Sequence, residues 1–258
     1  MKQNEGWCGI MSEEGKSNVR AVERALDLLL CFTIRSEWAM GELAEQTGLH
    51  KSTVHRMLAT LEDKGFVSRD RLTERYRLGL RVWELSANMP QTDDPGIISL
   101  PEMERLRDTL GETVSLYIRD GGERIRIQAV QSNQAVRRVA PVGARLPLYV
   151  GASSKVLIAF ESPGKREELL RESTWPESID RNQFRRMMSE IRASGYATSF
   201  EEREAGAAAV AAPVYNRAGI LIAALSVSGP SNRLTMDAMG EYVPAIMEAA
   251  RRIGALLR

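Results

Sequence analysis

The 258-residue sequence predicts an α+β protein with two domains, and three observations lead to this fold class. Three short segments with helical periodicity precede a strand hairpin before residue 80. From residue 99 on, helical and strand patterns alternate irregularly, which is typical of a mostly antiparallel sheet flanked by helices. Between them, the stretch NMPQTDDP at 88–95 contains two prolines and two aspartates, a composition typical of a domain boundary.

The first domain, over residues 17–80, begins with three predicted helices at 19–32, 40–47 and 50–64. Gly48 and Gly65 stop the second and third helices, because glycine adopts the positive φ that a helix end favours. The apolar positions at helical spacing are Val22, Leu26, Leu29 and Leu30 in the first helix, Leu43 and Ala44 in the second, and Val54, Met57 or Leu58, and Leu61 in the third.

A predicted hairpin follows the third helix. Phe66 and Val67 begin one strand, and Tyr76 and Leu78 lie in the other, with a polar turn between them. Residues 80–87 predict a further helix, so we expect a linker helix and boundary over 81–98. The first 16 residues are polar and contain glycine, so we expect 1–16 to be a disordered tail.

The second domain is predicted over residues 99–258, and its sheet is expected to be mostly antiparallel. Helices are expected over 100–110, 154–160, 164–171, 181–194 and 242–257. Strands are expected over 113–119, 124–130, 136–140, 207–214 and 221–228.

The bulk composition points to a cytoplasmic protein. Hydrophobic residues make up 43% and charged residues 27%, and no apolar run approaches the roughly 18 residues that span a bilayer. The two cysteines, Cys8 and Cys31, form no paired framework, and the N-terminus lacks a signal-peptide apolar stretch. We therefore expect a reduced, cytoplasmic location and no membrane partner.

Two helices joined by a short glycine-containing turn and followed by a hairpin match the winged helix-turn-helix plan. The chain carries a net charge of only +1, but residues 51–81 hold eight Lys or Arg against four Asp or Glu, a local net of +4. Residues 17–50 hold three against five, a net of −2. The third helix and the hairpin therefore form the positive face, although such a module also serves in some proteins as a protein-interaction unit.

The candidate DNA contacts come from the polar face of the third helix and from the basic hairpin. Arg56 is the best candidate for a guanine contact, because a guanidinium binds the guanine edge through two hydrogen bonds. The candidates are Lys51, Ser52, Thr53, His55, Arg56 and Thr60 in the helix, and Arg69, Arg71, Arg75 and Arg77 in the hairpin.

The second domain contains no histidine and no cysteine, since the only histidines are His50 and His55. Ser-His-Asp and Cys-His catalysis and a His or Cys zinc site are therefore not available within it. The acidic pairs at 167–168 and 201–202 lie in charged runs, and we interpret them as solvated faces. We expect no enzymatic activity, cofactor or metal.

A binding pocket suits this domain better. Ser226 and Ser228 share one face of an apolar strand, and buried hydroxyls need a partner or a ligand. The small residues at 151–154 precede a helix, whose free N–H groups favour an anion. The alternative remains open that these serines only cap the helix and bond within the sheet.

The run ELAEQTGLHKSTVHRMLATLEDKGFV, followed by YRLG and WELS, resembles the DNA reader of the IclR family of bacterial regulators. The resemblance continues through GETVSLYIRDG, PLYVGASSKVLIAF, GYATSFEEREAGAAAVAAPV and AALSVSGPSNR, and so covers nearly all of the chain from Asn18. His50 stands where the family pattern has proline, which removes the preset φ of the first helical turn.

This resemblance implies a transcriptional regulator that binds a double-stranded DNA operator. Its C-terminal part would be a GAF-like effector-binding and oligomerisation domain that binds a small organic acid. Dimers, suited to two operator half-sites, would associate into tetramers, and we expect the coupling between ligand and DNA to pass through residues 80–95. The runner-up interpretation is a sensor that recruits a protein partner instead of DNA.

The resemblance also implies a set of effector-binding residues. Two of them depart from the family pattern, since Ser199 stands where some members have aspartate and Ala209 where some have cysteine. The loop reads GASSK instead of the more usual Ser-Gly-Ala-Gly-Lys type. The implied positions are Gly151, Ala152, Ser153, Ser199, Ala209, Ser226 and Ser228.

Overall fold

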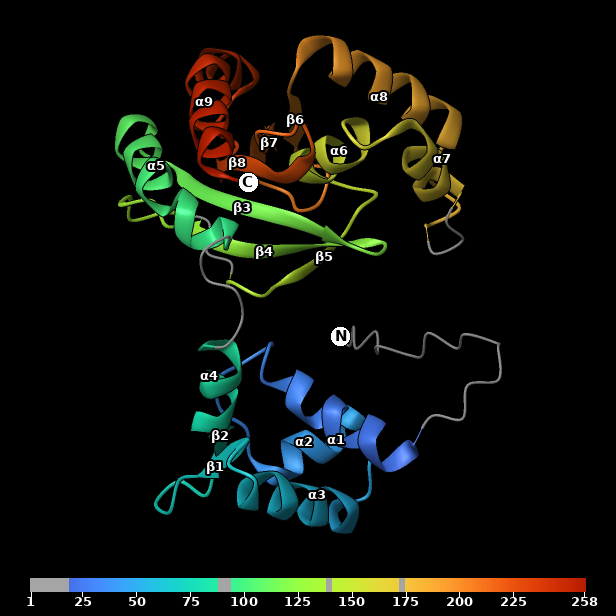
Figure 1. Ribbon diagram of the computed structural model, residues 1–258, viewed down its shortest axis with the longest axis vertical. Coiled ribbons are helices and arrows are strands. Elements are labelled where there is room, and N and C mark those ends of the chain that lie inside the picture. Colours follow the sequence, from blue (N-terminus) through green and yellow to red (C-terminus); the bar gives the residue numbers. More distant parts are fainter. Residues whose placement is uncertain (1–18, 88–93, 138–140, 172–174) are drawn as a thin grey trace. The chain divides into compact units, whose positions relative to one another are not determined.

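The computed structural model, drawn in Figure 1, describes residues 19–87, 94–137, 141–171 and 175–258. The chain divides into two compact units, Met1–Ser86 and Ala87–Arg258, and each is described by itself. The predicted tail at 1–16 and residues 88–93 of the predicted boundary lie outside the described residues.

The first unit is a winged helix-turn-helix. Its core gathers side chains from the first three helices and from the wing, including Leu28, Leu43, Leu58 and Tyr76. Trp38 pairs through its backbone with Tyr76, which attaches the segment between the first two helices to the wing. The elements are α1 (Arg20–Cys31), α2 (Met40–Thr47), α3 (Lys51–Asp63), β1 (Val67–Arg69), β2 (Tyr76–Leu78) and α4 (Leu80–Ala87).

Of the four apolar positions predicted in α1, only Leu29 packs, half-buried, against the core of the unit. Val22, Leu26 and Leu30 are 54%, 52% and 59% exposed, whereas Leu28 and Cys31 are buried in the core. These exposed residues repeat at helical spacing, and the stripe continues towards the N-terminus to Val19, which is 65% exposed. The helix is as the sequence predicts, but one of its two apolar faces remains uncovered within this unit.

The turn between α2 and α3 is fixed by local backbone chemistry. Gly48 has a φ of +67°, a left-handed conformation that suits glycine, and it ends α2. At the other end of α2, the Glu42 carboxylate accepts the N–H of Ala39 at 2.8 Å. This bond lowers the pKa of Glu42, and the nearby Arg35 and Arg75 lower it further.

The second unit contains a six-stranded sheet in the order β5-β4-β3-β8-β7-β6, with every neighbouring pair antiparallel. This agrees with the predicted α+β class. The strands are β3 (Thr113–Asp120), β4 (Glu123–Val130), β5 (Arg145–Pro147), β6 (Ala197–Phe200), β7 (Ala207–Tyr215) and β8 (Leu221–Pro230).

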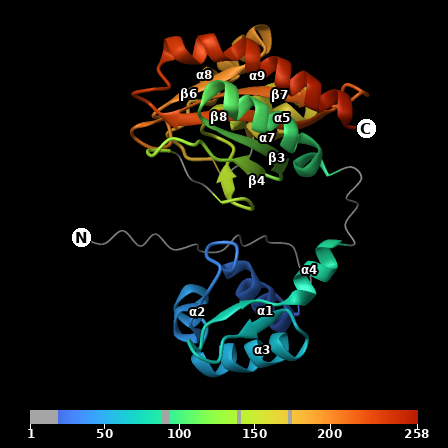
Figure 2. The same ribbon diagram turned by 90° about the vertical axis from the view of Figure 1, so that its left-hand side faces the viewer.

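Helices cover both faces of this sheet. Figure 2 shows α5 (green) and α9 (red) side by side on the face turned to the viewer, where they share one apolar core with the sheet. The helices α6 to α8 share a second core with the opposite face. The helices are α5 (Pro95–Leu110), α6 (Ala152–Ala159), α7 (Pro163–Arg171), α8 (Arg181–Ser194) and α9 (Met236–Leu256).

Strand β8 separates the two cores through its alternation. Leu225 and Val227 belong to the core beneath α5 and α9. Ser226 and Ser228 alternate with them and therefore point to the face that α6 covers. In the neighbouring strands, Ser115 lies opposite Ser226, and Ala209 lies opposite Ser228. The sheet thus presents a row of small and hydroxyl-bearing residues on its α6 side.

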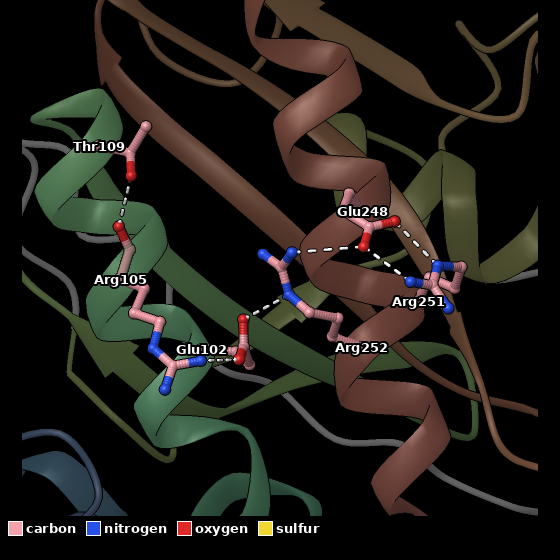
Figure 3. A network of polar contacts seen from close by, with 6 residues as sticks. All are labelled: Glu102, Arg105, Thr109, Glu248, Arg251 and Arg252. Carbon is pink, nitrogen blue, oxygen red and sulfur yellow. Dashed lines mark hydrogen bonds and ion pairs between the residues drawn. The ribbon is translucent and has the colours of Figure 1, made fainter.

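A network of ion pairs joins α5 to α9 (Figure 3). Glu102, whose side chain is only 9% exposed, binds Arg105 in its own helix and Arg252 in α9, the latter at 2.8 Å. Arg252 also reaches Glu248 at 3.3 Å, and Glu248 binds Arg251 at 2.7 Å. Both carboxylate oxygens of Glu102 are therefore used to hold the two helices together.

Two helices begin earlier than the sequence predicted, and each of them contains a proline. Helix α5 begins at Pro95, where Asp94 accepts the N–H of Gly96 at 2.7 Å, and it continues through Pro101. Helix α9 begins at Met236 and continues through Pro244. Tertiary packing against the sheet retains the helix past each proline.

The predicted strand at 136–140 is wrong in its described part. Val136 is 69% exposed and lies in an irregular segment, and residues 138–140 lie outside the described residues. The edge strand is β5 instead, which pairs with β4. The sequence analysis also missed β6, where β-forming residues follow the helix stop at Gly195.

Candidate functional sites

The outer face of α3 carries the polar residues proposed to contact DNA. Lys51, Ser52, His55, Arg56 and Thr60 are exposed, and Thr53 is half-buried. The inner face is formed by Val54 and Leu58, which are fully buried. Among the described residues, no hydrogen bond or ion pair occupies the Arg56 guanidinium, whereas the Thr60 hydroxyl donates to the Arg56 carbonyl at 3.0 Å.

His50 lies at the N-cap of α3 and not within its first turn. The missing proline was expected to remove the preset φ of that turn, and this expectation is corrected by the φ of His50. Its φ is −64°, the value that a proline ring would impose. Its ring Nδ1 lies 2.9 Å from the Ser52 hydroxyl. The backbone entry to α3 is therefore retained, and the imidazole adds a polar contact that a proline lacks.

The four wing arginines differ in how they are held. Arg69 forms an ion pair with Glu74 at 2.6 Å, and Arg77 donates to the Ser68 hydroxyl at 3.4 Å. Arg75 is half-buried and bonds Glu42 at 3.3 Å, which ties it to α2. Arg71 is exposed in the turn between the strands. Of these four side chains, Arg75 is the one that bonds a helix of the unit, namely α2.

The wing turn itself is organised by Asp70. Its carboxylate accepts the N–H groups of Leu72 and Thr73, both at 2.9 Å. These bonds stabilise the charged form and hold the pKa of Asp70 below its ordinary value. The turn that carries Arg71 is thus shaped by a local side-chain bond.

A groove runs between α1 and α3 on this unit, and two further arginines border it. Arg20 and Arg24 of α1 line the groove together with Arg56 and His55 of α3. Neither arginine is among the predicted DNA contacts, because both lie in a segment with a net negative charge. Their spacing of four residues on one helix places them on the same face.

The second unit has a hollow on the α6 side of its sheet. It is small, with a volume of about 50 Å³, and it opens to solvent. All seven residues that the family resemblance implied for effector binding border it, brought together from α6 and its preceding loop and from β6, β7 and β8. The full lining is Tyr117, Arg124, Gly151, Ala152, Ser153, Ser199, Arg203, Glu204, Ala207, Ala208, Ala209, Ser226 and Ser228.

The hydroxyls along the sheet remain only partly satisfied. Ser228 is 7% exposed, and its Oγ has no hydrogen-bond partner among the described residues. The same is true of Ser115, which lies opposite Ser226 in the register. By contrast, Ser154 donates to the carbonyls of Pro147 and Val150, so it serves the loop and not the hollow. Ser154 therefore bonds within the protein, as the structural alternative expects, whereas the Ser228 hydroxyl bonds no other described residue.

Glu201 and Glu202 are both exposed, as the sequence analysis expected, but their carboxylates also make specific contacts. Glu202 forms an ion pair with the buried Lys155 of α6, and it accepts the N–H of Gly151 at 3.4 Å. Glu201, which has a φ of +55°, accepts from Ser231 at 2.6 Å and from the N–H of Gly206 at 3.1 Å. Both carboxylates fix the loop between β6 and β7.

Four charged or aromatic residues of the hollow were missed by sequence reasoning, namely Tyr117, Arg124, Arg203 and Glu204. Arg124 is only 4% exposed, and its guanidinium carbon lies 5.5 Å from the centre of the Tyr117 ring. Arg203 and Glu204 form an ion pair at 3.6 Å in the loop after β6. The signal for Arg124 is its position in ERIRIQAV, where arginines alternate with isoleucines along one strand.

Within the described ranges, no group of three or more His, Cys, Asp or Glu side chains is placed to hold a metal ion. A search of the same residues finds no helix with the length and apolar character to cross a bilayer.

Comparison with known proteins gives a consistent result. Residues 21–71 match the IclR helix-turn-helix domain, and residues 96–255 match the Bacterial transcriptional regulator IclR C-terminal family. The chain is 32% identical to the HTH-type transcriptional regulator KipR of Bacillus subtilis, over 91% of this chain and 95% of that protein. It is 30% identical to the HTH-type transcriptional regulator KdgR of Escherichia coli, over 92% of each.

Solved structures agree with the sequence relatives. An IclR homologue from Microbacterium hydrocarbonoxydans, crystallised in complex with 4-hydroxybenzoate, has a TM-score of 0.79 and 28% identity, and the match covers 92% of this chain and 99% of that one. These relatives are regulators of transcription, a class without enzymatic function. The chain therefore belongs to the IclR family of bacterial transcriptional regulators, and it is a DNA-binding regulator and not an enzyme.

Proposed function

We propose that this regulator binds its operator through α3 and the wing, and that a small organic acid in the C-terminal hollow modulates its affinity for DNA. The observation that carries the ligand half is the hollow itself. Seven residues implied by the family resemblance border one site whose buried Ser228 hydroxyl has no partner among the described residues. The 4-hydroxybenzoate complex of the Microbacterium relative supports the choice of a carboxylate.

The proposed division of labour follows the two matched families. Residues 17–80 would bind DNA, 99–258 would bind the effector and form the oligomer, and 81–98 would connect them. Since a ligand shifts an equilibrium only by its differential affinity, the acid must favour one of two arrangements of the protein. A regulator of this kind acts on chromosomal DNA, so we place it in the bacterial cytoplasm.

A gel shift with the DNA that flanks its own gene tests both halves. The protein should retard a discrete fragment, and one member of a panel of small carboxylates should change the apparent Kd for that fragment. A protein that retards no fragment of its own neighbourhood in preference to unrelated DNA would contradict the DNA half. DNA binding that no carboxylate alters would contradict the ligand half.

We further propose a homodimer, with dimers associating into tetramers. The support is the uncovered apolar face of α1, where Val19, Val22, Leu26 and Leu30 are all more than half exposed. Contiguous apolar surface of this kind is typical of an interface. Light scattering coupled to size-exclusion chromatography should give a dimer or tetramer mass for the wild type. A monomer at micromolar concentration would contradict the proposal.

A further inference from the structure

We propose that the groove between α1 and α3 binds the sugar-phosphate backbone of the operator, with Arg20 and Arg24 each contacting a phosphate. This proposal rests on the proposed function, since it concerns the same DNA complex. It extends the DNA interface to α1, a helix that lies outside the reader and the wing. The supporting features are the lining of the groove, the state of its arginines, its charge and its position beside Arg56.

The groove is built from the first half of α1 and from the length of α3. Arg20 and Arg24 border it from α1, and His55 and Arg56 border it from α3. The lining between these polar groups includes three alanines, whose small side chains let a bulky partner come close to the helix backbone. These alanines are Ala21, Ala25 and Ala59. A strand of DNA therefore meets small side chains in the groove and basic ones at its borders.

The arginines of the groove have no protein partner in the part of the chain that the structure describes. Arg20 is exposed and Arg24 is half-buried, and neither guanidinium forms a hydrogen bond or an ion pair there. In the wing, by contrast, Arg69 and Arg75 are paired with glutamates. An unpaired guanidinium binds a phosphate without first breaking an ion pair, so the charge-assisted bonds to the phosphate contribute in full.

The groove is positively charged although its segment of the chain is acidic on average. Its lining contains three arginines and no aspartate or glutamate, which gives three net positive charges. Glu23 and Asp27 of α1 do not border it. The net charge of −2 over residues 17–50 therefore hides a local basic surface. Duplex DNA carries one negative charge for about every 1.7 Å of its axis, so its backbone complements this surface.

The groove lies beside the residue proposed to contact a base, since Arg56 borders it. A helix that enters the major groove has a phosphate backbone along each of its flanks. In Figure 1, the start of α1 (dark blue) and the wing lie towards opposite ends of α3. The wing would therefore contact the backbone on one flank of the reader, and Arg20 and Arg24 would contact it on the other.

The spacing of the two arginines suits one DNA strand. Four residues rise by about 6 Å along a helix. Successive phosphates of a strand advance by about 3.4 Å along the duplex, so two long side chains reach phosphates one or two steps apart. The exposed Val22 and Leu26 each lie two positions further along α1, which turns them by about 200° from the arginines. A second copy of the chain on that apolar stripe would leave the groove free for DNA.

The experiment measures DNA binding by the full chain as a function of salt. Anisotropy with the operator fragment from the gel shift would compare the wild type with Arg20→Ala, Arg24→Ala and the double variant. Each lost phosphate contact lowers the slope of log K against log salt by about 1, so the double variant should lose about 2. Arg24→Lys should keep the wild-type slope because it keeps the charge. The ratio of operator to scrambled DNA should not change, since phosphates carry no sequence information.

A second measurement identifies the phosphates. Neutral methylphosphonates would replace single phosphates along each strand of the operator fragment. Replacement of a phosphate that lies in the groove should weaken binding by the wild type but not by the double variant. Replacement of a phosphate that contacts the wing should weaken both proteins alike. A double variant that remains sensitive to every phosphate to which the wild type is sensitive overturns the proposal.

The matched control is Arg171→Ala, which removes an exposed arginine at the end of α7 in the other unit. It changes the net charge by the same amount and should keep the wild-type slope. If Arg24→Ala fails to fold by circular dichroism, Arg20→Ala decides the matter, because Arg20 is exposed and an unchanged slope there overturns the proposal.

The outcomes separate this proposal from the proposed function. A wild type that does not bind the operator contradicts the DNA half of the proposed function itself. A wild type that binds with a steep salt dependence, together with a folded double variant of equal slope, overturns the role of the groove alone. A double variant of equal slope but altered mass in light scattering overturns it too, and assigns the groove to a contact between copies. Loss of operator discrimination in the double variant would assign a base contact and overturn the phosphate contact.

Discussion

Lys155 and Glu202 form an ion pair that connects helix α6 to the loop after β6, although they lie far apart in the sequence. The Lys155 side chain is only 8% exposed, and its ammonium also donates to the Thr198 carbonyl at 2.9 Å. The second oxygen of Glu202 accepts the N–H of Gly151. One carboxylate thus ties the loop after β6 to the start of α6.

Lys155→Met should destabilise the second unit by about 1–3 kcal/mol, because it leaves the Glu202 carboxylate and the Thr198 carbonyl without their buried partner. Urea denaturation of the variant checks this value. A double-mutant cycle with Glu202→Gln should give a coupling free energy of roughly 0.5 kcal/mol or more. Arg185→Met, which removes an exposed pair with Glu167, is the control and should change stability by about 0.5 kcal/mol at most. Additive effects of the two variants would show that the ion pair carries no coupling.

Arg56→Ala should reduce discrimination between the operator and unrelated DNA by about tenfold or more, since a bidentate base contact contributes about 1–3 kcal/mol. The thermal stability of the variant should match the wild type, because the guanidinium is exposed and bonds no other described residue. Competition anisotropy with operator and scrambled duplexes measures the ratio. Arg185→Ala, in α8 of the other unit, is the control. A specificity ratio equal to that of the wild type would remove Arg56 from the reader.

Arg71→Ala and Arg75→Ala should behave differently in salt titrations of DNA binding. Removing one phosphate contact lowers the slope of log K against log salt by about 1. We expect this for Arg71, which is exposed in the wing turn, and a smaller change for Arg75, which is bonded to Glu42. Arg75→Ala should instead lower the melting temperature of the protein. Equal changes of slope in the two variants would contradict this distinction.

The Asp70 carboxylate should make the wing sensitive to acid. Its pKa is lowered in the folded state by the N–H groups of Thr73 and Leu72. The resulting stabilisation is therefore fully present above the unfolded value of about 3.9 and is lost as the pH falls through the lower folded value. Carbon-detected NMR titration should give Asp70 a pKa below that reference. Asp70→Asn should lower wing protection against hydrogen exchange at pH 7, and a normal pKa with normal protection would contradict the assignment.

Ser226→Ala combined with Ser228→Ala should weaken the response to an effector but leave the affinity of the ligand-free protein for DNA unchanged. The two hydroxyls border the hollow and lie in a different compact unit from α3. Operator anisotropy with and without the active carboxylate measures both quantities. Ser189→Ala, on the outer face of α8, is the control, since its hydroxyl bonds only within that helix. A double variant that responds at the wild-type ligand concentration would place the effector elsewhere.

Local patterns predicted most of the helices and most of the strands in the described residues. Gly48 ends α2 where the sequence predicts, because the left-handed backbone at that position favours glycine. The pattern placed the start of α5 at Leu100 and not at Pro95, since a proline normally marks a boundary. The strand at 136–140 was predicted from a short apolar run. Such a run does not show whether a neighbouring strand will pair with it.

The seven implied residues of the hollow came from motif resemblance, and they border one site in the structure. Arg124 and Arg126 could not be found in this way. They alternate with Ile125 and Ile127, and the usual interpretation of such a strand puts arginines on the solvent side. In this sheet that face is covered, so both arginines are buried.

The sequence by itself determined the family, the two-part organisation, the polar face of α3 and the positions of the serines on β8. These follow from local spacing and from motifs, which depend on residues close together in the chain. The tertiary structure decided which other residues they contact. The Glu42–Arg75 bond, the Lys155–Glu202 pair and the approach of Arg124 to Gly151 join segments that are distant in sequence. The exposed stripe of α1 is the face that no other segment of its unit covers. Such contacts depend on which faces pack together, and local periodicity does not encode that choice.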